Sequence, residues 1–194
     1  MIIVKERSKE WNIDLDNISI CGFSAGAHLA AMLGVNWNSK LLKDKFELEN
    51  EIFRPKSIIL GYPGIDYMVM KELNTKSKNE MDIDLFKVSN EALFGTNSPS
   101  DELRESLSIT NKITNNMPPT FIWHTANDEL VYAKNSLSLA LALSEKNVKY
   151  ELHIFEEGPH GMSLCNDITA STEEHINLEC EIWFELANKW LKKL

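Results

Sequence analysis

Apolar and polar positions along the chain follow two periods, one typical of buried strands and one typical of amphipathic helices. Short apolar runs bounded by turn residues predict strands at residues 18–21, 57–60, 120–124 and 149–155. Longer segments with apolar residues every three or four positions predict helices at residues 2–11, 25–37, 133–145 and 174–192. Because helices and strands alternate, the pattern predicts an α/β fold. We expect a mainly parallel sheet flanked by helices, in three αβα layers.

The first and last helices are each expected to bury one apolar face. In the first helix, Ile3, Val4 and Trp11 share a face. The last helix carries a stripe that repeats every three or four residues, as expected of a helix that packs against a sheet. The stripe consists of Ile176, Cys180, Trp183, Ala187, Trp190 and Leu191.

The segment from residue 67 to residue 116 differs from the rest of the chain. It is polar, with asparagine and serine clusters and short amphipathic pieces such as 83–94. Structureless connections of this length are uncommon in compact domains unless they are functional. We therefore expect one domain over residues 1–194, in which 67–116 is an insertion or cap over one face of the sheet.

Charge and composition exclude several classes of function. The formal net charge is -9 and the basic residues are scattered, so the chain lacks the basic stripe of a nucleic-acid binder. No apolar run approaches the roughly 18–20 residues that span a bilayer. The first residues lack the layout of a secretory signal, which favours a cytoplasmic location.

The three cysteines, Cys21, Cys165 and Cys180, are irregularly spaced. They form neither a metal-ligand motif nor a disulfide framework. We expect reduced thiols buried in the core, because free cysteine is usually buried. No metal or organic cofactor is expected.

Residues 22–26, Gly-Phe-Ser-Ala-Gly, match the G-x-S-x-G pattern of a nucleophile elbow. The motif lies between an apolar strand and an alanine-rich helix, which is the context that such an elbow requires. A sharp turn would push the Ser24 hydroxyl out of the sheet, and Gly22 and Gly26 would let strand and helix approach closely. The backbone N–H of Ala25 is the expected oxyanion donor. The alternative is a glycine-rich turn with an idle serine.

A serine nucleophile needs a base, and the base needs an orienting carboxylate, in the chain order Ser, Asp or Glu, His. Asp128 follows the strand at 120–124 and is the expected acid, because ligands bind at the carboxyl edge of a parallel sheet. Glu129 and Asp66 are its rivals. A helix cap or turn former is the alternative interpretation of Asp128.

His160 is the expected base, because Gly158-Pro159 and Gly161 flank it in a loop after a strand. A solvated loop histidine is the alternative. The other histidines are expected to be structural: His28 as a hydrogen-bonding residue beneath the serine, and His124 in core packing or in support of the acid loop. His153 and His175 lie within a strand and a helix.

These motifs together resemble the acetyl-esterase and acetylxylan-esterase-like branch of the α/β-hydrolases. The matching segments are residues 22–30, 62–63, 118–131 and 155–161. The resemblance implies Ser24 as nucleophile, Asp128 as acid and His160 as base. It also implies that the substrates are short-chain acyl esters, often of acetylated sugars.

The sequence departs from the family pattern in three ways. Asn127 and Ala27 stand where the family often has Asp and Gly. Family members also carry roughly a hundred further residues before this point, with the first strands and a His-Gly-Gly loop that gives a second oxyanion N–H. No His-Gly-Gly occurs in this sequence. We therefore expect the C-terminal part of the fold, with an open sheet edge that a second copy or crystal neighbours cover.

Two other functional readings remain open from the sequence. One is a non-catalytic or incomplete hydrolase remnant that needs a missing N-terminal segment. The other is a peptidase or thioesterase with the same three residues, since only the shape of the pocket distinguishes these activities from that of an esterase.

Overall fold

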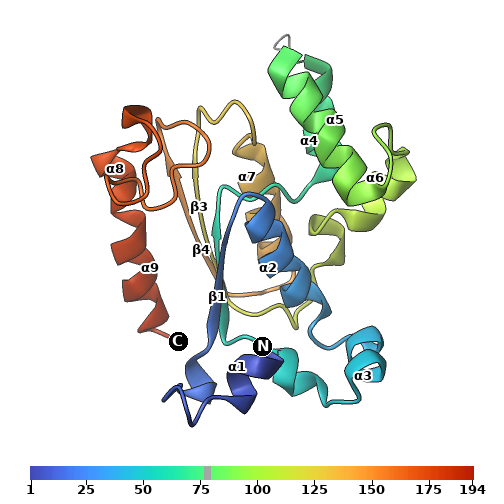
Figure 1. Cartoon of the computed structure of the whole chain (residues 1–194), viewed down its shortest axis with the longest axis vertical. Coiled ribbons are helices and arrows are strands. Elements are labelled where there is room, and N and C mark those ends of the chain that lie inside the picture. The colour runs from blue at the N-terminus through green and yellow to red at the C-terminus, as the bar shows by residue number, and fades with distance from the viewer. Residues whose placement is uncertain (77–79) are drawn as a thin grey trace.

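The computed structural model describes residues 1–76 and 80–194, apart from the side chains of residues 81 and 82. Its centre is a four-stranded parallel sheet in which the strands lie in chain order (Figure 1). The strands are β1 (Ser19–Phe23), β2 (Ser57–Gly61), β3 (Thr120–Thr125) and β4 (Tyr150–Phe155). The predicted parallel α/β fold is therefore confirmed, and each strand lies within two residues of its expected position.

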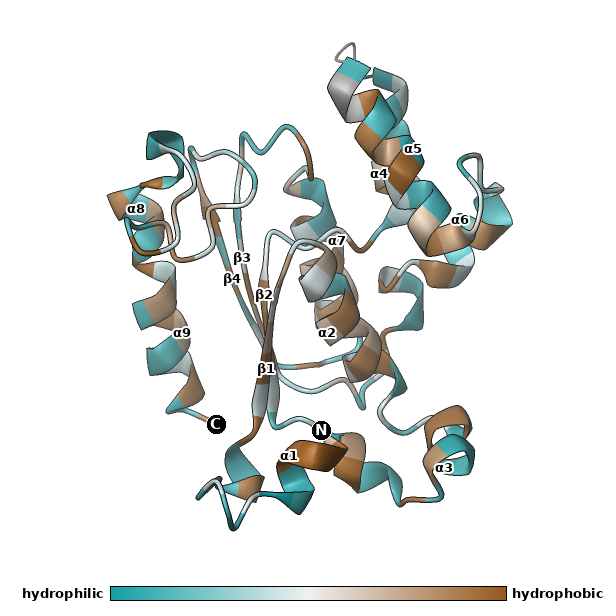
Figure 2. Ribbon diagram, in the orientation of Figure 1, coloured by the Kyte–Doolittle hydropathy of each residue, from teal (hydrophilic) through white to brown (hydrophobic). Residues whose placement is uncertain are grey.

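Helices cover both faces of the sheet, as the pattern predicted. The helices α2 (Ala25–Asn36) and α7 (Lys134–Glu145) lie on one face, and α9 (Trp183–Leu191) lies on the other (Figure 1). The strand β2 shows why both faces are covered, since all five of its residues are buried. A strand with two buried faces is mostly apolar, as Ile58, Ile59 and Leu60 are in β2. Figure 2 shows that β1 and α2 are largely hydrophobic as well.

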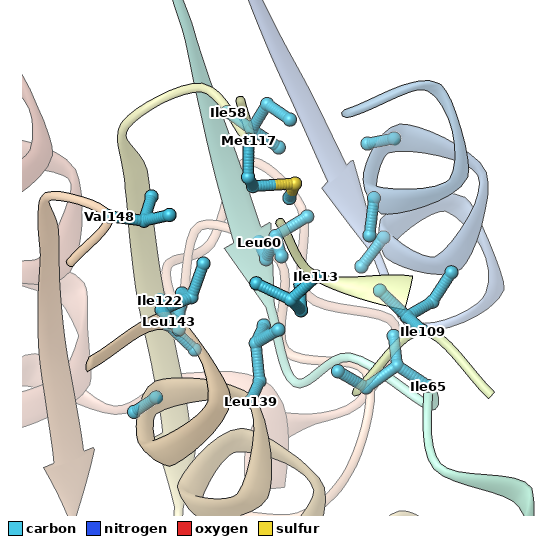
Figure 3. Close-up of a cluster of buried hydrophobic side chains, with 14 residues drawn as sticks. Ile58, Leu60, Ile65, Ile109, Ile113, Met117, Ile122, Leu139, Leu143 and Val148 are labelled. Atoms are coloured by element: carbon cyan, nitrogen blue, oxygen red, sulfur yellow. The ribbon is translucent and has the colours of Figure 1, made fainter. Parts of the chain in front are cut away.

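Two clusters of buried side chains form the core, one on each face. Ile58, Leu60 and Ile122 point from the sheet toward α2 and α7, where they belong to one cluster with Leu139 and Leu143 (Figure 3). Adjacent residues of the same strands point the opposite way, because side chains alternate along a strand. These residues, among them Ile59, Phe121 and Trp123, pack against Trp183, Ala187 and Trp190 of α9.

The connection between β2 and β3 holds three helices, α4 (Tyr67–Lys76), α5 (Glu80–Phe94) and α6 (Asp101–Leu107). Figure 1 shows them extending away from the sheet, beyond α2 and α7. The chain on either side of them returns to the core through the buried Ile65 and Ile109. The insertion expected at 67–116 includes residues 77–79, which lie outside the described residues.

The first helix is shorter than expected. The element α1 spans Ile2–Glu6, and the chain then turns through Asn12, whose φ of 51° is left-handed. Trp11 is 46% exposed, so the buried face expected over residues 2–11 does not form. The short elements that follow are η1 (Leu15–Asn17), α3 (Lys40–Phe46), η2 (Asn50–Phe53) and η3 (Thr110–Lys112).

The last helix begins later than predicted and is divided. After η4 (Glu173–His175), the Asn177 side chain accepts hydrogen bonds from the backbone N–H groups of Glu179 and Cys180 and so caps α8 (Leu178–Glu181). Ile176 precedes this cap and is 45% exposed, so its place in the buried stripe was wrong. Four members of the stripe are buried as predicted: Cys180, Trp183, Ala187 and Trp190.

Cys21 is exposed, which contradicts the prediction that all three cysteines are buried. The strand β1 lies at the edge of the sheet. Its neighbouring residue Ile20 packs against the cluster on the α2 side, so Cys21 faces the opposite side. The helix α9 covers the β2 and β3 side chains of that face. Cys165 and Cys180 are buried, as predicted.

Candidate active site

The turn from β1 into α2 holds Ser24 in a strained conformation. Its φ of 51° and ψ of −119° lie outside the regions that ordinary residues occupy, and its N–H donates to the Gly61 carbonyl at 3.0 Å. Strained backbone at a strand-to-helix turn that presents a hydroxyl is the geometry of a nucleophile elbow. Ser24 therefore has the backbone geometry that the predicted elbow requires.

The turn requires glycine at position 22 but leaves room for a side chain at Gly26. A Cβ atom on Gly22 would lie 2.3 Å from the Gly26 carbonyl oxygen, so only glycine fits where β1 and α2 meet. A Cβ atom on Gly26 would meet no described atom within 4 Å. The expectation that both positions require a small residue was therefore right for Gly22 and wrong for Gly26, because the close approach is to the backbone of Gly26 and not to its Cβ position.

His160 lies between the other two predicted residues. Its Nε2 atom is 2.8 Å from the Ser24 Oγ, and its Nδ1 atom is 2.7 Å from the Asp128 Oδ2. It belongs to the loop after β4, where Gly158 and Gly161 adopt positive φ angles of 153° and 92°. The structure thus brings His160 together with Ser24, which lies 136 positions earlier in the chain, and with Asp128, which lies 32 positions earlier.

Asp128 is buried at the end of β3 and fully supplied with hydrogen-bond donors. Its Oδ1 atom accepts from the backbone N–H groups of Leu130 and Val131 at 3.0 and 2.9 Å. Burial by itself raises the pKa of a carboxyl group, but hydrogen bonds from His124 and His160 outweigh it here. They lower the pKa of Asp128 to about 2, so the carboxylate stays ionised.

The rival acids do not contact His160 in this arrangement. Asp66 accepts hydrogen bonds from the N–H groups of Met68 and Val69 and so caps the first turn of α4. Glu129 is exposed and lines a cavity beside His160. Of the three acidic candidates, Asp128 alone is within hydrogen-bond distance of the imidazole.

The remaining histidines have other partners. His28 is buried in α2, and its Nδ1 atom is 3.1 Å from the Tyr67 hydroxyl, which links the serine-bearing helix to α4. Burial lowers the pKa of His28. His153 is 3.0 Å from a Glu151 carboxylate oxygen. His175 lies 2.8 Å from the Ser171 hydroxyl.

Tyr62 is part of the site, although the sequence indicated it only through the Tyr-Pro pair of the resemblance. It follows β2 with a φ of 37°, and its ring centroid lies 4.8 Å from that of His160, edge to face. Its hydroxyl accepts a hydrogen bond from the Ser163 N–H at 3.0 Å, in the same loop as His160. Burial raises the pKa of Tyr62 to about 12. Its place directly after a central strand could have identified it.

A cavity of about 750 Å³ adjoins His160. Its wall combines carboxylates and amides with a few apolar groups, among them Leu85 of α5. The polar members are Asn127, Glu129, Glu157, Glu174 and Asn177. Such a lining offers hydrogen-bond partners to a small polar molecule.

Ala25 is the first residue of α2, so helix geometry gives its N–H no partner within the helix. This N–H lies directly after Ser24, at the positive end of the helix dipole, where a negative oxygen is favoured. Within residues 1–76 and 80–194, no group of three or more His, Cys, Asp or Glu side chains could hold a metal ion. No helix of this part of the chain is long and apolar enough to cross a membrane.

The contacts of His160 meet the geometric requirement for general base catalysis. The Asp128 carboxylate can only accept, so the proton of His160 lies on Nδ1, and Nε2 is free to accept from the Ser24 hydroxyl. A buried carboxylate that fixes the tautomer of an imidazole is the arrangement that activates a serine.

Known proteins are similar to this chain in sequence and in fold. The BD-FAE family model matches residues 1–143. The curated endo-1,4-beta-xylanase B of Butyrivibrio fibrisolvens is 33% identical over 165 residues, which cover 84% of this chain and 23% of that protein.

Solved structures of esterases are similar to the fold of this chain. The carboxylesterase Cest-2923 from Lactobacillus plantarum WCFS1 gives a TM-score of 0.76 at 26% identity, over 98% of this chain and 63% of that chain. The acetyl ester-xyloside bifunctional hydrolase from Caldicellulosiruptor lactoaceticus gives 0.73 at 34% identity, over 98% and 61%. This chain spans less than two thirds of the length of each of these proteins. It belongs to the BD-FAE family, whose members are esterases of the α/β-hydrolase fold.

Proposed function

We propose that this chain is a serine esterase that cleaves short-chain carboxylic esters, with Ser24 as nucleophile, His160 as base and Asp128 as the orienting acid. The observation that carries the proposal is the continuous pair of hydrogen bonds, 2.8 Å from Ser24 to His160 and 2.7 Å from His160 to Asp128. The strained φ of Ser24 supports it, because the strain places the hydroxyl beside the base.

The reaction proceeds in two halves. The Nε2 atom of His160 takes the proton of the Ser24 hydroxyl as Oγ bonds to the ester carbonyl carbon, and the Ala25 N–H binds the resulting oxyanion. The tetrahedral intermediate then breaks its bond to the leaving oxygen, which takes the proton from His160. Water, deprotonated by the same imidazole, attacks the acyl-serine and releases the acid and Ser24.

Esters of acetylated sugars are the substrate class that we favour. His160 lines the cavity beside it, and the carboxylates and amides of that cavity can bind sugar hydroxyls. The similar enzyme from Caldicellulosiruptor lactoaceticus is an acetyl ester-xyloside bifunctional hydrolase. We propose that the segment 67–116 acts as a cap within a single domain, since Leu85 of this segment lines the same cavity.

The test is hydrolysis of p-nitrophenyl acetate and of an acetylated xylo-oligosaccharide by the full chain. Ser24→Ala removes the nucleophile, and Ser144→Ala, at an exposed serine of α7, is the matched control. We expect Ser24→Ala to lose at least about 10³-fold in kcat, while Ser144→Ala keeps the full rate. A folded wild-type chain that hydrolyses neither ester faster than Ser24→Ala would refute the proposed activity and favour a non-catalytic hydrolase-like protein.

The outer edge of β1 is the proposed contact for a second copy. Among the described residues β1 pairs only with β2, and Cys21 in its middle is exposed. Unpaired strand edges bind other strands readily. Light scattering after size exclusion is expected to give a mass near twice 22.2 kDa, and a monomer at all protein concentrations would contradict this proposal.

A further inference from the structure

His124 is buried at the end of β3 and has a polar partner at each ring nitrogen. Its Nδ1 atom is 2.7 Å from the Ser136 hydroxyl of α7, and its Nε2 atom is 2.6 Å from the Val131 carbonyl oxygen. The same Nε2 atom lies 3.3 Å from the Asp128 Oδ2. Both side chains of this last pair are fully buried, so water does not weaken the contact.

The partners fix the place of one proton on His124. A carbonyl oxygen can only accept, so Nε2 carries a proton and donates it to Val131, with the Asp128 Oδ2 nearby at 3.3 Å. The contact of Nδ1 with the Ser136 hydroxyl orients the ring. Asp128 is the titratable group that contacts His124 in the described part of the chain, so no other charge competes for this proton.

The Asp128 carboxylate accepts three hydrogen bonds and has the His124 N–H as a fourth, more distant neighbour. Two backbone groups bind Oδ1, from Leu130 and Val131. Two imidazoles face Oδ2, His160 at 2.7 Å and His124 at 3.3 Å. A carboxylate with donors on both oxygens cannot rotate, so Oδ2 stays directed at His160.

We propose that His124, oriented by Ser136, is a positioning residue that holds the Oδ2 atom of Asp128 toward His160 and shares its negative charge. The role rests on the proposed esterase function, in which Asp128 orients the base. Without the His124 donor, the charge on Oδ2 faces His160 alone. That charge would hold the proton on His160 more tightly and make its imidazole a weaker acid toward the leaving alcohol.

Two conservative variants separate this role from simple core packing. His124→Gln places an amide N–H close to the position of Nε2, so it keeps the donor to Asp128. His124→Asn places its amide near Nδ1, so it keeps only the contact with Ser136. Leu139→Ala, a buried residue of α7 away from Asp128, is the control for a loss of stability alone.

The direct measurement is an NMR titration of the His160 ring in the full chain, whose five histidines are few enough to assign by mutation. In His124→Asn we expect the His160 titration midpoint to rise by about 0.5 to 1 pH unit, and in His124→Gln to stay within about 0.2 units of the wild type. With p-nitrophenyl acetate, the pH at which kcat falls on the acid side of its pH profile should rise by the same amount in His124→Asn. Its kcat should fall about tenfold with KM unchanged.

A structural role alone predicts a different result. In that case His124→Asn would resemble Leu139→Ala, with a lower melting temperature but the wild-type His160 midpoint and the wild-type pH profile per active molecule. That result would overturn the positioning role. If the wild-type chain hydrolyses no ester, the proposed function fails, while the NMR titration still decides whether His124 shares the charge of Asp128.

Discussion

Gly22→Ala is the perturbation whose effect the geometry determines most closely. The added Cβ atom would lie 2.3 Å from the Gly26 oxygen, 2.6 Å from the Gly26 carbonyl carbon and 2.8 Å from the Ala27 nitrogen. All three are backbone atoms, so no side chain can rotate away. The strand β1 and the helix α2 must therefore separate until the shortest contact reaches at least 3.0 Å.

The cost follows from this forced separation. Overpacking a core typically costs about 1–3 kcal/mol, and a backbone collision lies at the upper end of that range, so we expect a loss of about 3 kcal/mol in the free energy of unfolding. For a chain of 194 residues, each kcal/mol lowers Tm by roughly 2–4 °C. The expected decrease in Tm is therefore roughly 6–12 °C.

Gly26→Ala is the matched control, because the same methyl group is added four residues later with no described atom within 4 Å. Alanine favours a helix over glycine by up to about 1 kcal/mol, so this variant should be as stable as the wild type or slightly more stable. Urea unfolding followed by tryptophan fluorescence measures both variants. If Gly22→Ala unfolds within about 0.5 kcal/mol of the wild type, the close approach of β1 and α2 is incorrect.

Three further predictions concern the site and the thiols. Tyr62→Phe keeps the ring beside His160 but leaves the Ser163 N–H without its acceptor, so the free energy of unfolding should fall by about 1–2 kcal/mol in urea titrations. The pKa of Asp128 is lowered to about 2, so its ionisation stabilises the fold above about pH 4 and this contribution is lost as pH falls toward 2. This ionisation should contribute about 2 kcal/mol to the free energy of unfolding. Asp128→Asn cannot ionise, so its stability should fall by about that much less between pH 4 and pH 2. In the dilute native chain, where the proposed dimer dissociates, a maleimide reagent should modify Cys21 before the other two thiols, and in urea all three should react. Desolvation raises the pKa of Cys21 to about 11, so this native reaction should be slow, and a second native thiol that reacts at the same rate would contradict the burial of the other two.

The strands and the main helices were predictable because their signals are local. A strand such as β2 is buried on both faces and therefore reads as an uninterrupted apolar run. Errors arose at helix ends: Asn177 caps α8, which begins at Leu178, four residues after the predicted start. Apolar periodicity continues across such a cap, so it does not reveal where the backbone stops being helical.

The proximity of Ser24, Asp128 and His160 was predictable for a topological reason. Each follows a strand of a parallel sheet, and the carboxyl ends of parallel strands meet at one edge. The exposure of Cys21 was not predictable in this way. An apolar strand has the same sequence pattern in the middle of a sheet and at its edge. Only the order of the strands in the sheet places β1 at the edge.

The sequence by itself determined the type of fold, the succession of strands and helices along the chain, and the residues able to activate a serine. Each of these depends on residues that are close together in the sequence. The tertiary structure decided which groups surround those residues. It placed the Tyr62 ring against His160 and a second imidazole, that of His124, against Asp128. The first contact joins the loops that follow β2 and β4, and the second depends on how the chain turns after β3. Neither geometry is encoded by a local pattern.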